Sequence, residues 1–137
     1  MISLGLDIYA EDLIANYEHP HNKRRLSHSD SESHEYNPIC GDDITVYIKV
    51  NDGKIEDISF EGNGCAISVG TASKLTDLVK GKSLSEIERM GFEDIVNLIG
   101  IDPGPARAKC ASISLKALKH AVFVYEHKNS DAVTDKL

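Results

Sequence analysis

The strongest constraint on the fold of this chain is an alternating pattern of side chains between residues 44 and 60. Over residues 44–50 every second position is aliphatic: Ile44, Val46, Ile48 and Val50. This is the period of a strand with one buried face. Residues 51–53 (Asn-Asp-Gly) are typical of a hairpin turn, and Ile58 and Phe60 then resume the alternation. The segment predicts an antiparallel hairpin, and Ile55, which is out of phase, indicates a bulge or a late start in the second strand.

The rest of the chain predicts helices around this hairpin, with a short strand before it at 32–36. Apolar periodicity and capping signals indicate helices over 7–19, from Cys65 to near Gly81, over 83–90, over 92–98, and from Pro105 to about 125. No linker or repeat divides them. We therefore expect one domain over 1–125, a small antiparallel sheet followed by helices, and a polar, flexible tail over 126–137.

Charge and cysteine count exclude several classes of function. The net charge of -7 argues against nucleic acid as a partner, because phosphate binding needs a basic face. No apolar run reaches the length of a membrane span, and the N-terminus lacks the basic region of a signal peptide. Three cysteines suit a disulfide framework poorly, so we expect free thiols in a reducing, cytoplasmic location.

The segment 37–43, Asn-Pro-Ile-Cys-Gly-Asp-Asp, places a thiol close to a carboxylate. Cys40 and Asp42 are separated only by Gly41, which lets the backbone turn. A thiolate and a carboxylate at this spacing repel each other unless a cation lies between them. The pair therefore raises the hypothesis of a metal site.

The other two cysteines also lie where helices are expected to begin. Cys65 is placed at a helix N-terminus, and Cys110 lies early in the last helix beside Lys109, with Arg107 one turn earlier. Helix dipoles and nearby cations favour thiolate over thiol, so we expect a lowered pKa at Cys65 and Cys110.

A buried, purely structural role is the alternative for each cysteine taken alone, and Cys110 is the most open to it. Taken together, three thiolates and one carboxylate supply four ligands: Cys40, Asp42, Cys65 and Cys110. Such a set suits tetrahedral zinc, and iron suits thiolates equally well. Arg107 and Lys109 would offset the excess negative charge.

Four segments resemble, in order, the motifs of the NifU N-terminal/IscU/SufU family of iron–sulfur scaffold proteins. They are "HPHNKRRL", "NPICGDD", "EGNGCAIS" with Thr71-Ala72-Ser73, and "PARAKCASISLKAL". The resemblance runs from about residue 9 to 122. It implies an α+β fold with a three-stranded antiparallel sheet and helices packed on one side.

The resemblance also implies a function. The chain would build a [2Fe–2S] cluster on Cys40, Asp42, Cys65 and Cys110 and pass it to apo-proteins. Sulfur would arrive as persulfide from a cysteine desulfurase, with the three cysteines as acceptors. Asp42 would keep the cluster transferable, and zinc would occupy the same ligands in the cluster-free form.

Two other functions stay open. Lys109 stands where IscU-type members carry histidine and matches SufU-type members, which favours a zinc-dependent sulfurtransferase, and the protein would then be an enzyme. SufU-type members, however, have a longer segment between the second and third cysteines. The chaperone-binding motif of IscU-type members is replaced by "IDPGPARAK". The third alternative is a structural zinc domain.

The serines and threonine after Cys65 carry no predicted chemistry. Ser68, Thr71 and Ser73 are expected on the helix surface, and no histidine has a fixed spacing to them. Serine hydrolysis is therefore rejected.

Overall fold

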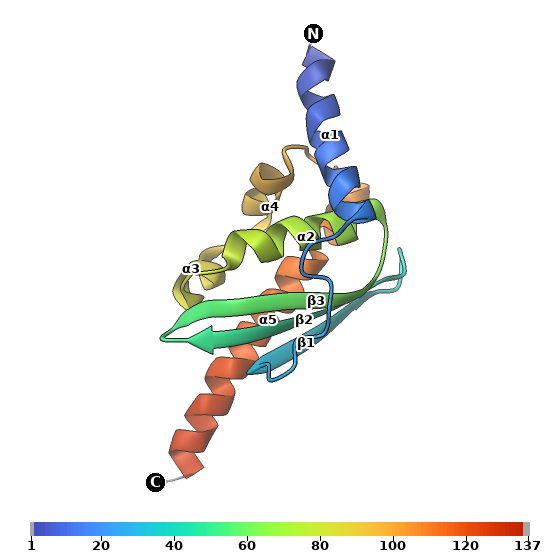
Figure 1. Ribbon diagram of the computed structural model, residues 1–137. Coiled ribbons are helices and arrows are strands. Elements are labelled where there is room, and N and C mark those ends of the chain that lie inside the picture. The colour runs from blue at the N-terminus through green and yellow to red at the C-terminus, as the bar shows by residue number, and fades with distance from the viewer. Residues whose placement is uncertain (1, 136–137) are drawn as a thin grey trace.

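The computed structural model describes residues 2–135, and Figure 1 shows the arrangement of its elements. A long helix precedes the sheet and four helices follow it. In chain order the elements are α1 (Ile2–Glu18), β1 (Ser31–Asn37), β2 (Asp42–Asn51), β3 (Lys54–Asn63), α2 (Ala66–Val79), α3 (Leu84–Arg89), α4 (Phe92–Ile99), the 3-10 turn η1 (Pro105–Arg107) and α5 (Ala108–Asp135).

The three strands form one antiparallel sheet in the order β1-β2-β3. In the hairpin, Ile48 lies opposite Ile58 but Val50 lies opposite Ile55, so the register shifts between Lys49 and Val50. This shift is the bulge that the phase of Ile55 indicates, and it returns Ile55 to the buried face. The hairpin and the additional strand are confirmed.

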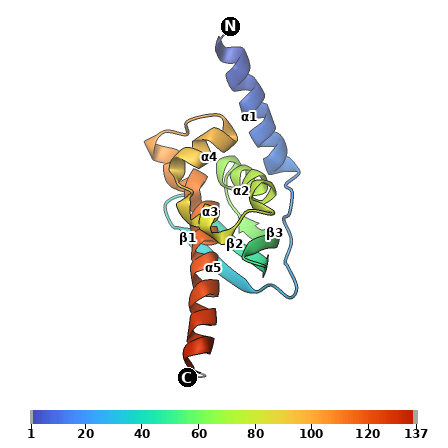
Figure 2. The same cartoon turned by 90° about the vertical axis from the view of Figure 1, so that its left-hand side faces the viewer.

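The helices cover one face of the sheet. Helix α5 packs on β1 and β2, and α2 packs on β3 and on α5. Figure 2 shows α2 and α5 between the sheet and the smaller helices. The core between these layers is largely aliphatic, and its fully buried larger side chains include Ile44, Ile48, Ile58, Phe60, Leu75, Val79, Ile95 and Leu118. The predicted fold class is confirmed.

Particular residues mark the ends of the short helices. The Ser83 hydroxyl accepts a hydrogen bond from the Glu86 amide at 3.1 Å, so Ser83 caps α3 as predicted. Pro105 opens η1, a position that needs no amide donor. Gly100 ends α4 in the left-handed region.

The first and last helices extend further than the apolar stripes indicate. Helix α1 begins at Ile2 rather than near residue 7, and α5 continues to Asp135 rather than to about residue 125. An apolar stripe records which turns of a helix are packed, whereas helicity also continues through residues that lack proline. The expected end of the last helix was therefore wrong, while the flexibility of the tail stays a prediction.

Between residues 2 and 135 no helix combines the length and the apolar character needed to cross a bilayer.

Candidate metal centre

Cys40 lies on the short loop that joins β1 to β2. The Gly41 amide donates to the Asn37 carbonyl at 2.7 Å, and Gly41 has φ of +74°, a conformation that favours glycine. The Asn37 side chain also accepts from the Ile39 amide at 3.2 Å. This turn leaves Cys40 exposed at one end of the molecule.

Asp42 is the first residue of β2 and is completely buried. Its Oδ1 atom accepts two hydrogen bonds from the start of α2, from the Cys65 amide at 3.1 Å and the Ser68 hydroxyl at 3.0 Å. Its Oδ2 atom is also buried, but within the part of the chain that the structure describes it has no partner. A buried carboxylate oxygen without a donor is costly, so this atom is a candidate ligand for a cation.

Glycine before α2 is required by the close approach of Asp42. A Cβ atom at Gly64 would lie 2.2 Å from the Ser68 Oγ and 2.7 Å from the Asp42 Oδ1. Gly62 has φ of +129°, and a Cβ there would lie 1.8 Å from the Asp43 carbonyl oxygen. Glycine at these two positions lets the end of β3 and the start of α2 pack closely against the first residues of β2.

Cys110 is fully buried near the start of α5, and its sulfur lies 3.0 Å from that of Cys40. One ligand atom from each of Cys40, Asp42 and Cys110 falls within 4.8 Å of the other two. The three residues come from the β1–β2 loop, the start of β2 and the start of α5. The fold therefore brings together three of the four ligands that the sequence predicts.

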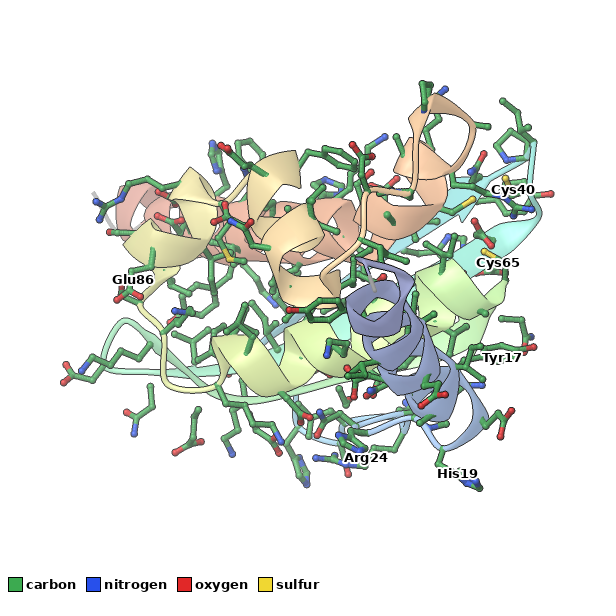
Figure 3. The ribbon with its side chains drawn as sticks, turned by 90° about the horizontal axis from the view of Figure 1, so that it is seen from above. Tyr17, His19, Arg24, Cys40, Cys65 and Glu86 are labelled. Carbon is green, nitrogen blue, oxygen red and sulfur yellow. The ribbon has the colours of Figure 1, made fainter. Side chains whose placement is uncertain are left out.

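Cys65 is at the edge of this group rather than inside it. It is the N-cap residue of α2, it is half-buried, and its amide binds Asp42. Figure 3 shows Cys65 and Cys40 at the same end of the molecule, far from Glu86. Cys65 thus lies next to the candidate centre without joining the compact set of three.

Burial raises the pKa of the Cys110 thiol above its ordinary value, and its hydrogen bond with Cys40 and the nearby charge of Asp42 raise it further. The expectation of a lowered pKa at Cys110 was therefore wrong for the metal-free protein. The pKa of Cys110 is raised because loss of hydration and nearby negative groups outweigh the local positive charges. A metal ion would reverse this balance, because coordination deprotonates a thiol outright.

The two cations beside Cys110 occupy different surroundings. Arg107 is exposed, and its pKa is raised by the nearby Cys110 thiol and, to a smaller extent, by Cys65 and Cys40. Its role as a supporting charge stays a prediction. Lys109 is exposed and lines a hollow between β1 and α5 that also involves Tyr36. Its role as a supporting charge for the thiols stays a prediction.

The residues present fit a metal ion or a small metal–sulfur group. Two thiols and one carboxylate supply soft ligands and one harder ligand. Cys65 lies beside the group, because its amide donates to Asp42. The exposed Cys40 leaves the set accessible from outside. Structural zinc sites are closed, whereas sites that exchange a ligand keep an open position.

Ser68 lies in the site, although the sequence predicts it on the helix surface. Ser68, Thr71 and Ser73 are all completely buried, not on the helix surface. The expectation failed because the face of α2 near its N-terminus packs against polar groups of other elements. A signal was present in the spacing, since a serine three residues after a helix N-cap hydrogen-bonds readily to the turn that begins there.

The fold and these side chains define a small α+β domain with a candidate thiol and carboxylate centre at one end. The chain belongs to the family of the NifU-like N terminal domain, whose model matches residues 8–132.

Two relatives carry the names of two different functions. The chain is 32% identical over 122 residues to the iron-sulfur cluster assembly scaffold protein IscU 1 of Archaeoglobus fulgidus, covering 89% of this chain and 79% of that protein. It is 35% identical over 139 residues to the zinc-dependent sulfurtransferase SufU of Bacillus subtilis, covering 89% and 94%. The crystal structure of a NifU-like protein (N-terminal) from Brucella abortus is similar in fold, with a TM-score of 0.74, 21% identity, and coverage of 89% and 96%.

Proposed function

We propose that this protein is an iron–sulfur cluster assembly scaffold. It receives sulfur from a cysteine desulfurase, builds a [2Fe–2S] cluster and transfers that cluster to apo-proteins. The family and the scaffold relatives support this function. The observation that carries it is the buried, unpaired Oδ2 of Asp42 beside two thiols whose sulfurs are 3.0 Å apart.

Each ligand has a separate role in this proposal. Cys40, Asp42 and Cys110 hold the cargo as a preformed set, and Cys65 completes it from the start of α2. Cys40 is the exposed thiol and the first that an incoming persulfide meets, while Cys65 and Cys110 are the further acceptors. Asp42 contributes an oxygen, which binds iron less firmly than a fourth thiolate would and so favours release.

The same four residues would hold zinc or iron when no cluster is present. Zinc accepts tetrahedral sulfur and oxygen ligands and would keep the thiols together and deprotonated. Arg107 would offset part of the negative charge of that set, a role that its raised pKa supports, and Lys109, next to Cys110 in the chain, is proposed to assist.

A zinc-dependent sulfurtransferase is the second candidate function. The 35% identity to SufU of Bacillus subtilis and the lysine at position 109 favour it. In that case the protein is an enzyme that accepts persulfide sulfur on one cysteine. A purely structural zinc domain is disfavoured, because Cys40 is exposed and a structural site would be closed.

The proposed partners are a cysteine desulfurase and apo iron–sulfur proteins, which would approach the exposed loop at Cys40. Ile39 on this loop is 80% exposed and Tyr36 before it is 58% exposed, so apolar surface adjoins the thiol. The negative net charge supports no role for nucleic acid or a membrane surface. We propose a cytoplasmic location, where thiols stay reduced, and residues 1–125 as the functional domain.

Anaerobic reconstitution with iron, cysteine and a desulfurase tests the two candidates. A scaffold is expected to develop stable visible absorbance and to pass its cluster to an apo-ferredoxin. A sulfurtransferase is expected instead to stimulate the desulfurase when loaded with zinc, without retaining a cluster. Failure of both, with unchanged metal content in Cys40→Ala, Cys65→Ala and Cys110→Ala, would reject a metal-dependent function.

A further inference from the structure

Ser68 has one hydroxyl proton and two acceptors at equal distance. Its Oγ lies 3.0 Å from the Asp42 Oδ1 and 3.0 Å from the Cys65 carbonyl oxygen. A hydroxyl donates one hydrogen bond at a time, so the two contacts alternate. Ser68 therefore joins a predicted ligand, Asp42, to the backbone of another, Cys65.

The two oxygens of Asp42 are made different by these contacts. Oδ1 accepts from both Ser68 and the Cys65 amide, while Oδ2 is left free and buried. A carboxylate fixed in this way presents one oxygen to a metal ion rather than two. The position of the hydroxyl is itself fixed, because Ser68 is completely buried and Gly64 packs against it.

We propose that Ser68 is a positioning residue for Asp42. With the proton donated to Oδ1, Ser68 holds the carboxylate so that only Oδ2 binds the metal. When Asp42 turns away from this position, the proton rotates to the Cys65 carbonyl, and no buried donor is left unpaired. Ser68 thereby supports binding in one orientation and lowers the cost of release in the other.

This inference rests on the proposed function only in that the centre binds metal. It requires neither cluster assembly nor a desulfurase. Binding of Zn²⁺ and Co²⁺ to the purified full chain therefore tests it separately from scaffold activity.

The experiment compares Ser68→Ala with Ser73→Ala. Ser73 is equally buried on the same helix and makes two hydrogen bonds, donating to Asn16 at 2.6 Å and accepting from the His21 amide at 2.8 Å, without touching Asp42. Competition with a chelator gives the Zn²⁺ affinity, and the visible spectrum of the Co²⁺ form reports ligand geometry. Ser68→Ala is expected to weaken Zn²⁺ binding by about 10- to 100-fold and to change the Co²⁺ spectrum, as is usual when the partner of a ligand is removed. Ser73→Ala is expected to change neither.

Two further sets of variants separate positioning from packing. In an Asp42→Ala background, Ser68→Ala is expected to have no further effect on Zn²⁺ affinity, because the group that it positions is gone. Ser68→Thr keeps the hydroxyl and Ser68→Val removes it at the same size. The threonine variant is expected to bind Zn²⁺ more tightly than the valine variant, and this pair decides the question if Ser68→Ala does not fold.

Equal Zn²⁺ affinities in Ser68→Ala and Ser73→Ala, or the same loss with and without Asp42, would overturn the inference. If Ser68→Ala weakens Zn²⁺ binding but wild-type protein builds no cluster, the positioning role holds and the scaffold function fails. If wild-type protein builds and transfers a cluster while Ser68→Ala binds Zn²⁺ like wild type, the function holds and the positioning role fails.

Discussion

The two ends of α2 differ in how their polar groups are paired. At the C-terminal end, the Asn22 side chain donates to Thr76 at 2.9 Å and to Asp77 at 2.8 Å and accepts from Lys80 at 2.7 Å. At the N-terminal end, one oxygen of Asp42 has two donors, and the other has none among the residues that the structure describes. The first end has these polar groups paired within the fold, whereas the second leaves a buried carboxylate oxygen without a donor.

A hollow in the surface lies away from the N-terminal end of α2. A hollow of about 640 Å³ lies near the C-terminal end of α2 and involves Leu78, Met90 and Leu98. The charged side chains around it carry both signs and form no compact set of ligands in the described structure. The unpaired carboxylate oxygen of Asp42 beside two thiols, rather than this hollow, therefore marks the candidate chemistry.

The largest expected contrast between the two ends is in metal affinity. Cys110→Ala removes a ligand of the compact set and is expected to weaken Zn²⁺ binding by more than about 100-fold, beyond the usual effect of losing a ligand's partner. Leu78→Ala, at the other end of α2, is the matched control and should bind Zn²⁺ like wild type. Elemental analysis and chelator competition measure both, and equal zinc contents in the two variants would contradict the comparison.

Gly64→Ala tests the close approach at the N-terminal end. The new Cβ would meet the Ser68 hydroxyl and the Asp42 carboxylate, so we expect about 10- to 100-fold weaker Zn²⁺ binding. Gly91→Ala is the control, since no atom lies within 4 Å of a Cβ there and its φ is not positive. A Gly64→Ala variant that binds Zn²⁺ as tightly as Gly91→Ala would show that the site tolerates displacement of these two side chains.

Asn22→Ala tests the C-terminal end, where the effect should be on stability instead. The variant loses three hydrogen bonds and places alanine at φ of 62°. We expect the free energy of unfolding to fall by about 1–3 kcal/mol, with unchanged Zn²⁺ affinity. Asn22→Gly relieves the backbone cost and should lose less. Denaturant unfolding measures all three proteins, and a changed Zn²⁺ affinity in Asn22→Ala would mean that the two ends are coupled.

The smallest expected effect is a dependence of metal-free stability on pH. The raised pKa of Cys110 means that the unfolded chain releases this proton at lower pH than the folded chain does. Stability is thus unaffected below the ordinary pKa of 9.0 and falls as the pH rises above it, by about 1 kcal/mol at pH 10. Melting temperatures of metal-free wild type and Cys110→Ala at pH 8 and pH 10 check this, and equal losses in the two proteins would contradict it.

The sequence predicts the sheet well because alternation and a turn motif are local signals. Ile55 even indicates the bulge, since its phase conflicts with that of Ile58. The sequence also predicts the cysteines and Asp42 as ligands for a chemical reason, because thiolates and a carboxylate close together repel each other unless a cation lies between them. Their convergence depends on how the start of α5 packs against β2, and the family resemblance, rather than any local pattern, implied it.

The sequence could not predict the environment of the buried groups. Arg107 and Lys109 are close to Cys110 in sequence and predict a lowered pKa of its thiol, but burial has the larger effect and raises that pKa. The sequence places Ser68 on the surface because serine is usually exposed. Its burial depends on Asp42, which lies 26 positions away and cannot be paired with it from a local pattern. The assignment of Cys65 as a ligand, and the boundary at residue 125, stay predictions.

The direction of α5 has a practical consequence. This helix carries Cys110 in its first turn and extends over 28 residues, about 42 Å, so that its C-terminal end lies far from its first turn (Figure 1). A fluorophore or a surface anchor attached near residue 135 would therefore sit remote from Cys40 and leave its approach unobstructed. Docking partners can be titrated against immobilised protein in this orientation, with the reactive end facing the solution.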